Sequence, residues 1–434
     1  MRSTWLLVSG VVVGCGEVSV TPDAATDSAE ADAAPDAAID APPPTFAVGG
    51  TVTGLAGTGL VLRLNGADLA IAANGAFSFP GSLADGANYM VTIGSQPSCP
   101  QRLCMLSNAA GTIAGADASV TVTCSLPRYR LASVNWGSPQ GVRITDDILS
   151  LANAATATPR IVTGASTTLA NSQTDSAAFD RARNAIYVPA ETTVPDVAIL
   201  VFANAATTTG NVAPARRIVV TGETRFYGVE LDEAADRLYA SGESGKLYIF
   251  NNASTLAGTV TPTAAITVTS PGAIDLDRKT DRLYVAARTT SLYVFDGARQ
   301  LTSVSTPSRT VTWTNPTDFA RSVAIDGCRN RLYVGIRNVS TAGANVFVFD
   351  NASALTGAID LATASQAQLA VPGTQVMSSA LDGLGNFYFW KDSATQVNIV
   401  NAPHTLTGAV TVTPDKVINA VVDRGYGIDV MAFP

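Results

Sequence analysis

The sequence predicts an all-β protein, with a small β-sandwich and a larger array of repeated sheets behind a disordered tether. Only 14% of the 434 residues are charged. Val, Thr, Ile and Tyr recur in short runs separated by Gly, Pro, Asn and Asp, as is typical of strands joined by turns. From about residue 126 onward, one pattern of strands and turns is repeated to the end of the chain. These three observations predict the fold class.

The chain begins with the layout of an export signal: Arg2, a short apolar run, and then a cysteine. The run is too short to cross a bilayer as a helix. Val12–Cys15 resembles the lipobox of bacterial lipoproteins. The resemblance implies a signal peptide over residues 1–14, and acylation (palmitate-type chains) of Cys15, which then holds the protein to a lipid bilayer. Gly16 favours the outer membrane, on its periplasmic face or at the cell surface, and the alternative is an ordinary secreted signal.

Residues 15–44 read as a tether. They are mostly Ala, Asp, Pro, Thr and Ser, so they cannot bury enough apolar surface to offset the entropy of ordering, and we expect disorder. Seven of the 35 acidic residues lie here and none of the 27 basic ones, which leaves 28 acids against 27 bases elsewhere. The folded part is therefore nearly neutral. It has no basic stripe to neutralise phosphates, so we expect no binding to nucleic acid.

Residues 45–125 predict the sandwich. Asn65-Gly66 and Asn74-Gly75 are hairpin signals, because both residue types accept the positive φ of tight turns, and we expect them to join three successive strands. Together with Gly49–Leu55, they resemble immunoglobulin-like or transthyretin-like modules of bacterial surface proteins. Such modules are usually spacers.

The five cysteines suit an exported protein. With Cys15 acylated, we favour a Cys104–Cys124 disulfide, whose 20-residue separation would stabilise the fold by ~3 kcal/mol. Cys99 could replace Cys104 in that pair, and Cys328 has no evident mate. The spacings and the presence of one histidine argue against zinc.

A six-fold repeat fills residues 126–434. Each copy consists of an apolar strand that ends in Asp, a turn and a second strand. Successive aspartates lie 52, 45, 49, 56 and 41 residues apart: Asp180, Asp232, Asp277, Asp326, Asp382 and Asp423. In four copies a tyrosine follows seven residues later: Tyr187, Tyr239, Tyr284 and Tyr333. A third strand recurs in forms such as Ile249–Ala253, and a fourth starts after a proline such as Pro214. All-β repeats of four strands are typical of β-propeller blades. We expect each Asp to accept turn amides and each Tyr to pack between blades.

The ends of the array predict how the ring closes. Residues 148–163 carry only a third and a fourth strand, and residues 419–433 only a first and a second, so together they would complete a sixth blade. A seventh blade is expected if Arg128–Trp136 contributes strands and is not a connector. The Asp-turn-Arg-Leu-Tyr-Val pattern of Asp277–Val285 and Asp326–Val334 resembles NHL-type, YncE-type and lactonase-like propellers. This resemblance implies an architecture and not an activity.

Evidence for catalysis is sparse. Lactonase-like propellers hold a divalent metal in the channel, and the resemblance makes Glu230, Asp275 or Asp382 the candidate ligands, although no group of acids stands out. His404 is the only histidine, and it lies in a loop. No Gly-x-Ser-x-Gly elbow appears. We therefore expect a protein without catalytic residues, metal or cofactor.

The sequence thus favours non-covalent binding of a protein or glycan partner by loops on a rigid scaffold. The longest insertion between second and third strands is Gly335–Asn345, and we predict Ile336, Arg337, Asn338 and Val339 in it as the partner-binding loop. Two alternatives stay open. One is a metal-dependent lactonase-like hydrolase, and the other is a structural or adhesive surface protein.

Overall fold

Strands account for nearly all of the regular structure. The computed structural model describes residues 43–135, 140–169, 176–190, 197–338, 344–371, 375–391, 395–419 and 425–433. Within these ranges, no helix is both long and apolar enough to cross a bilayer. The predicted signal peptide, Cys15 and nearly all of the tether lie outside the described residues.

The first folded part consists of two four-stranded sheets, with strand orders β5-β2-β10-β8 and β4-β3-β7-β9, and a small β1-β6 pair. The strands are β1 Thr45–Phe46, β2 Val48–Thr53, β3 Leu60–Leu64, β4 Ala67–Ile71, β5 Gly75–Ser78, β6 Leu83–Ala84, β7 Asn88–Ser95, β8 Leu103–Ser107, β9 Ala110–Thr112 and β10 Ala118–Ser125. Residues such as Val52, Leu62 and Val122 alternate along these strands and meet in one buried core. That alternation is the period of two expected of sheets with one solvated face.

The two Asn-Gly pairs have different roles. Asn65 and Gly66 both have positive φ and join β3 to β4 as a tight hairpin, as predicted. The hairpin predicted at Asn74-Gly75 is wrong, because β4 and β5 belong to different sheets. The Asn74 amide instead accepts the Leu55 N–H at 2.7 Å and donates to the Leu55 carbonyl at 2.9 Å. Asn74 therefore fixes the segment in which the chain passes from the sheet of β4 to the sheet of β5.

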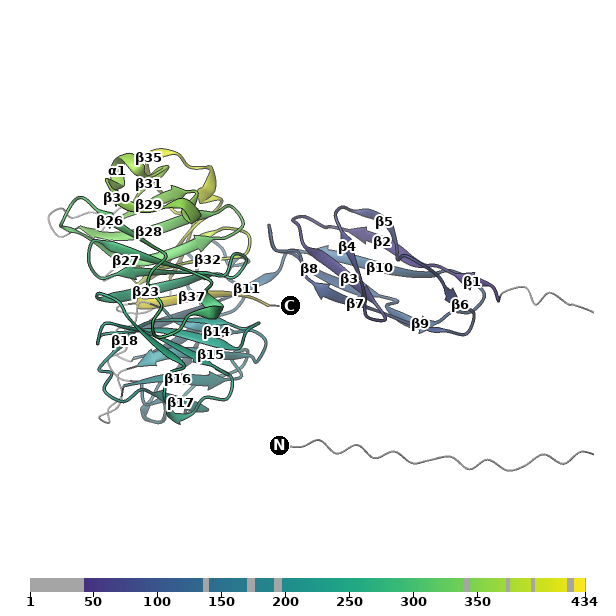
Figure 1. The fold of residues 1–434 in the computed structure, drawn as a ribbon, viewed down its shortest axis with the longest axis horizontal. Coiled ribbons are helices and arrows are strands. Elements are labelled where there is room, and N and C mark those ends of the chain that lie inside the picture. The colour runs from purple at the N-terminus through teal and green to yellow at the C-terminus, as the bar shows by residue number, and fades with distance from the viewer. Residues whose placement is uncertain are drawn as a thin grey trace, which may run out of the picture. The chain divides into compact units, whose positions relative to one another are not determined.

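The second folded part is a β-propeller of six sheets (Figure 1). From the innermost to the outer strand, their orders are β37-β11-β12-β13, β14-β15-β16-β17, β18-β19-β20-β22, β23-β24-β25-β26, β27-β28-β29-β31 and β32-β33-β34-β36. The innermost strands contact one another in a closed ring: β14, β18, β23, β27, β32 and β37. A channel therefore runs between these six strands.

The bounds of the propeller strands in the first three sheets are β37 Gly425–Phe433, β11 Arg128–Asn135, β12 Gly141–Thr145, β13 Arg160–Val162, β14 Ala178–Asp180, β15 Ala185–Ala190, β16 Ala198–Ala203, β17 Arg216–Val219, β18 Phe226–Asp232, β19 Arg237–Gly242, β20 Lys246–Asn251 and β22 Ala264–Thr267. Those in the other three are β23 Pro271–Asp277, β24 Arg282–Ala287, β25 Ser291–Asp296, β26 Arg309–Trp313, β27 Asp318–Asp326, β28 Arg331–Asn338, β29 Ala344–Asp350, β31 Ala367–Val371, β32 Val376–Leu381, β33 Phe387–Lys391, β34 Gln396–Val400 and β36 Lys416–Asn419. The short helices are α1 Leu361–Ala364 and the single turns Ala165–Thr167, Ala298–Gln300, Ala352–Ala354 and Pro403–Thr405.

Closure of the ring differs from the prediction. The C-terminal strand β37 lies beside β11, as the yellow and blue arrows in Figure 1 show, and pairs with it antiparallel. The shared blade therefore takes one strand from the C-terminal end and three from residues 128–162. Arg128–Asn135 forms its second strand and is neither a connector nor part of a seventh blade. The third strand of this blade is Gly141–Thr145. It was predicted after residue 148, but that segment forms turns.

Neighbouring blades are also joined along their outer edges. Short strands between the third and fourth strands of one blade pair parallel with the outer strand of the blade before it: β21 Gly258–Thr259 with β17, β30 Gly357–Ile359 with β26, and β35 Gly408–Thr411 with β31. Single bridges join Val162 to Gly210 and Thr156 to Asn419 in the same way. These pairings occupy edges that would otherwise expose unpaired backbone groups.

The repeated aspartates have the predicted structural role. Asp180, for example, accepts the Arg183 amide at 2.9 Å, and Asp326 accepts the Cys328 amide at 3.0 Å. Equivalent bonds are made by Asp232, Asp277 and Asp382, whereas Asp423 lies outside the described residues.

The repeated tyrosines are fully buried and pack between blades, as predicted: Tyr187, Tyr239, Tyr284 and Tyr333. Tyr388 takes the same place in a fifth blade, one residue earlier relative to its Asp. Its hydroxyl donates to Asp382 at 2.9 Å. The repeat is thus explained by packing and turn geometry.

Two disulfides are present among the described cysteines. Cys104 and Cys124 are bonded as predicted, and they face each other directly across β8 and β10. Cys99 bonds to Cys328, 229 residues away. The second bond joins the sandwich to the propeller.

Candidate functional site: the propeller channel

A cavity of about 350 Å³ lies within the ring of innermost strands. All six strands contribute to its wall, for example through Phe179, Ile325 and Ala380. Gln101 of the sandwich also lines it. Small-molecule sites in proteins usually have volumes of ~300–1,000 Å³, so this cavity is at the small end of that range.

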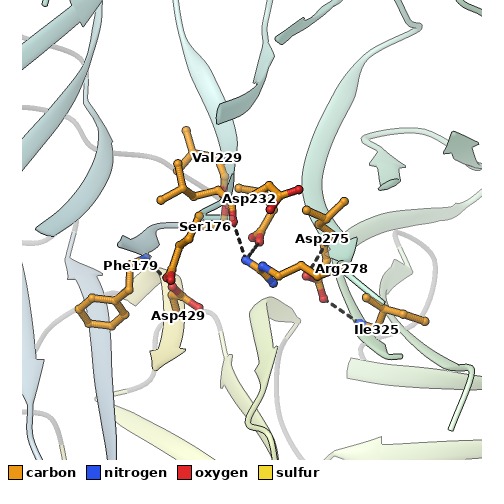
Figure 2. Close-up of polar contacts among 12 residues, drawn as sticks. Ser176, Phe179, Val229, Asp232, Asp275, Arg278, Ile325 and Asp429 are labelled. Atoms are coloured by element: carbon orange, nitrogen blue, oxygen red, sulfur yellow. Dashed lines mark hydrogen bonds and ion pairs between the residues drawn. The ribbon is translucent and has the colours of Figure 1, made fainter. Parts of the chain in front are cut away.

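Four charged side chains meet in the wall of this cavity: Glu230, Asp275, Arg278 and Asp429. Figure 2 shows Arg278 reaching between the acids, with Asp275 and Asp429 on different strands. The Arg278 guanidinium forms an ion pair with Glu230 and donates to the Leu231 carbonyl at 2.7 Å. Half of the Arg278 side-chain surface is nevertheless exposed. Since Arg278 lines the cavity, its guanidinium can donate to a molecule bound there.

The aspartates of the channel bind backbone amides of the next blade. Asp429 Oδ2 accepts the Phe179 N–H at 2.7 Å, and Asp275 Oδ2 accepts the Ile325 N–H at 2.7 Å (Figure 2). The second oxygen of each accepts the amide of the residue that follows it. Both carboxyl groups therefore hold neighbouring innermost strands together.

Serine hydroxyls make similar links elsewhere in the ring. The Ser176 hydroxyl exchanges hydrogen bonds with both backbone groups of Val229. Ser378 accepts the Ile428 amide at 3.0 Å. The wall of the channel is thus fixed by polar links between blades, which keep the side chains around the cavity in place.

Burial shifts the acidity of these groups. It raises the pKa of Asp429 to about 7 despite the amide hydrogen bonds. Burial likewise raises the pKa of Asp275 and, well above its usual range, that of Glu230. Burial alone would lower the pKa of Arg278, but the carboxylates of Glu230, Asp275 and Asp429 outweigh it and raise that pKa. Arg278 is therefore a fixed positive charge in the wall of the cavity, which Arg181 and Arg299 also line.

Two of the three candidate ligands named from the resemblance, Glu230 and Asp275, do meet at the channel. Asp382 does not: its carboxylate is bound to its own turn and to Tyr388. Among the described residues, no group of three or more His, Cys, Asp or Glu side chains is arranged to hold a metal ion. His404 lies in the turn Pro403–Thr405 and is not part of the cavity lining.

The predicted partner-binding loop requires a correction. Ile336, Arg337 and Asn338 belong to strand β28, and Ile336 is 2% exposed in a core between blades. A side chain buried there cannot contact a partner. Arg337 is exposed, and Val339 lies outside the described residues.

Sequence reasoning missed Arg278, Asp429 and Gln101. Arg278 lies in a turn just after a repeated Asp, and two other copies, with Arg181 and Arg424, also have an arginine there, so position in the repeat did not single it out. Asp429 lies in β37, which lacks the repeat signature, and Gln101 comes from the sandwich. An arginine in a blade turn close to inner-strand acids is the one signal that the sequence did carry.

Comparison with known proteins gives no family. No family model matches the chain, and no curated protein matches it. Among solved structures, the chain is similar to a chain in a crystal structure of a mitotic checkpoint complex, with a TM-score of 0.39 and 12% identity over 60% of this chain and 67% of that one. Similarity at this level supports no inference about function.

Proposed function

We propose that this protein is an exported lipoprotein that binds a protein or glycan partner non-covalently through its propeller. The observation that supports the proposal best is the channel cavity, with a half-exposed guanidinium held among carboxyl groups on a rigid ring. Its polar lining suits a small polar group, such as a sugar residue or a polar side chain at the tip of a partner. Specific polar groups in a preformed cavity are typical of binding sites.

The channel acids favour binding over metal-dependent catalysis. Both oxygens of Asp275 and both oxygens of Asp429 accept backbone amides, so their orientation serves the ring. The second candidate, a metal-dependent hydrolase, therefore has no specific observation in its favour among the described residues.

A screen for partners tests the binding proposal. The ectodomain from residue 45 would be applied to a glycan array, and the full-length protein would be used for proximity labelling in its own cell envelope. We expect a reproducible glycan or protein that is retained by wild type and lost in Arg278→Ala. Lys279→Ala is the matched control, because Lys279 is the exposed neighbour in the same turn and does not line the cavity. Equal retention by both variants would place the contact elsewhere, and no retained partner at all would contradict the proposal.

The anchoring part of the proposal rests on Val12–Cys15 and is tested separately. Cells fed an alkyne-tagged palmitate should label the wild-type protein and not Cys15→Ser. The wild-type protein should fractionate with outer membranes, and the variant should leave the membrane fraction. An unlabelled wild-type protein with a free thiol at Cys15 would refute the anchoring.

A further inference from the structure

The sandwich is joined to the propeller by two covalent routes. The first is the chain itself, since only Leu126 and Pro127 separate β10 from β11. The second is the Cys99–Cys328 disulfide. A second attachment point restricts the relative motion of two rigid bodies that one short link alone would leave free to hinge.

The segment that carries Cys99 is firmly held on the sandwich side. The Ser98 amide donates to the Thr58 carbonyl at 3.0 Å, and the Arg102 amide donates to the Pro97 carbonyl at 3.1 Å. Gly57 packs so closely against this segment that a Cβ there would lie 2.3 Å from the Pro100 carbonyl oxygen. Ser98–Gln101 therefore moves with the sandwich as one rigid hairpin.

The same hairpin is docked on the propeller beside the cavity. The Gln101 amide donates to the Gly383 carbonyl at 2.7 Å, and the Tyr129 hydroxyl donates to Gln101 Oε1 at 3.1 Å. A Cβ at Gly383 would lie 2.1 Å from that same oxygen, so only glycine allows this approach. Gln101, Tyr129 and Gly383 all line the cavity. The hairpin thus forms part of the cavity wall.

The two disulfides differ in accessibility. Cys104 and Cys124 are 2% and 6% exposed in the core of the sandwich. Cys99 and Cys328 are each partly exposed. Exposed disulfides are the ones that thiol reagents attack first.

We propose that the Cys99–Cys328 disulfide is a reducible latch that holds the Ser98–Gln101 hairpin in the wall of the channel cavity. A dithiol reductant attacks one sulfur, the S–S bond accepts two electrons and two protons to give two cysteine thiols, and the reductant becomes a disulfide. The Leu126–Pro127 link and non-covalent contacts such as those of Gln101 then hold the sandwich in place. The hairpin can swing away at this hinge, which opens the cavity on that side.

Graded reduction of the purified protein with dithiothreitol tests the latch. Alkylation and mass spectrometry should find Cys99 and Cys328 modified before Cys104 and Cys124. Residue-resolved hydrogen exchange on the selectively reduced protein should then show the Gln101 amide exchanging at least tenfold faster. The Ser98 amide is the matched control, because its hydrogen bond lies within the sandwich and should keep its protection.

A Cys99→Ser/Cys328→Ser variant should reproduce the reduced state without reagent. If this variant fails to fold, the selectively reduced wild-type protein supplies the same measurement. Unchanged exchange at Gln101 after reduction would mean that the contacts alone keep the hairpin docked, and the latch would be rejected. Reduction of the buried pair first would also reject it. These readouts do not involve a partner, so they succeed or fail independently of the proposed binding function.

Discussion

Ser241 and Gly272 link two neighbouring blades, because the Ser241 hydroxyl donates to the Gly272 carbonyl at 2.5 Å. The same hydroxyl accepts the Gly228 amide at 2.8 Å, and the serine is fully buried. The hydroxyl therefore satisfies two backbone groups that water cannot reach.

Replacing Ser241 with alanine should lower the free energy of unfolding by ~1–3 kcal/mol, because a buried amide and a buried carbonyl lose their partner. Urea denaturation would measure the change. Ser119→Ala, at an exposed position of the sandwich, should change it by less than ~0.5 kcal/mol. Equal effects in the two variants would show that the interblade link contributes nothing.

Asp429 should make the propeller less stable as the pH rises. Its pKa is about 7 in the folded protein against an ordinary value of 3.8, so the folded state binds the proton more tightly than the unfolded state. The favourable contribution is complete below about pH 4 and is lost as the pH rises to about 7, at up to ~1.4 kcal/mol per pH unit. The raised pKa values of Glu230 and Asp275 act in the same direction.

Urea denaturation of wild type and Asp429→Asn between pH 5 and pH 8 checks this. Wild type should be more stable at pH 5 than at pH 8, and the variant should show a smaller decline. A wild-type protein that gains stability over this range would contradict the assigned burial of these acids.

Two tyrosines of the repeat should respond differently to loss of the hydroxyl. The Tyr388 hydroxyl donates to the buried carboxylate of Asp382, so Tyr388→Phe should cost ~1–3 kcal/mol. The buried Tyr239 hydroxyl has no hydrogen-bond partner within the described structure, so Tyr239→Phe should be neutral or slightly stabilising. Thermal unfolding of both variants provides the comparison, and the reverse order would be incompatible with the hydrogen bonding described.

Ile336 should matter for stability and not for partner binding. Ile336→Ala removes a side chain packed between blades and should cost ~2–5 kcal/mol. Arg337→Ala, next to it and exposed, should stay within ~0.5 kcal/mol of wild type. Chemical denaturation of both proteins would decide, and a tolerated Ile336→Ala would mean that this part of the core is loosely packed.

The six-bladed architecture could be predicted because the features that build each blade are local. An Asp that accepts turn amides and a Tyr that packs against the next blade recur at fixed spacing, so Asp277 and Tyr284 are visible in the sequence. The shared blade was misassigned because β11 and β37 lack this pair. Their register depends on closure of the ring, which no short stretch of sequence encodes.

The channel and the Cys99–Cys328 bond depend on long-range contacts. Asp429 and Phe179 are 250 residues apart in the chain, and the two cysteines are 229 apart. Glu230 and Asp275 could be named as channel acids, but their meeting with Arg278 and Asp429 needed the folded ring. Residues that act through such contacts carry no spacing signal.

The most direct test of the account is a titration of the retained partner against three forms of the ectodomain, with the partner's mass checked afterwards. Calorimetry should give saturable binding to wild type, at least tenfold weaker binding to Arg278→Ala, and binding within twofold of wild type for Lys279→Ala, while mass spectrometry recovers the partner unaltered. Undiminished binding to Arg278→Ala, or a partner whose mass has changed, would contradict non-covalent recognition at the channel.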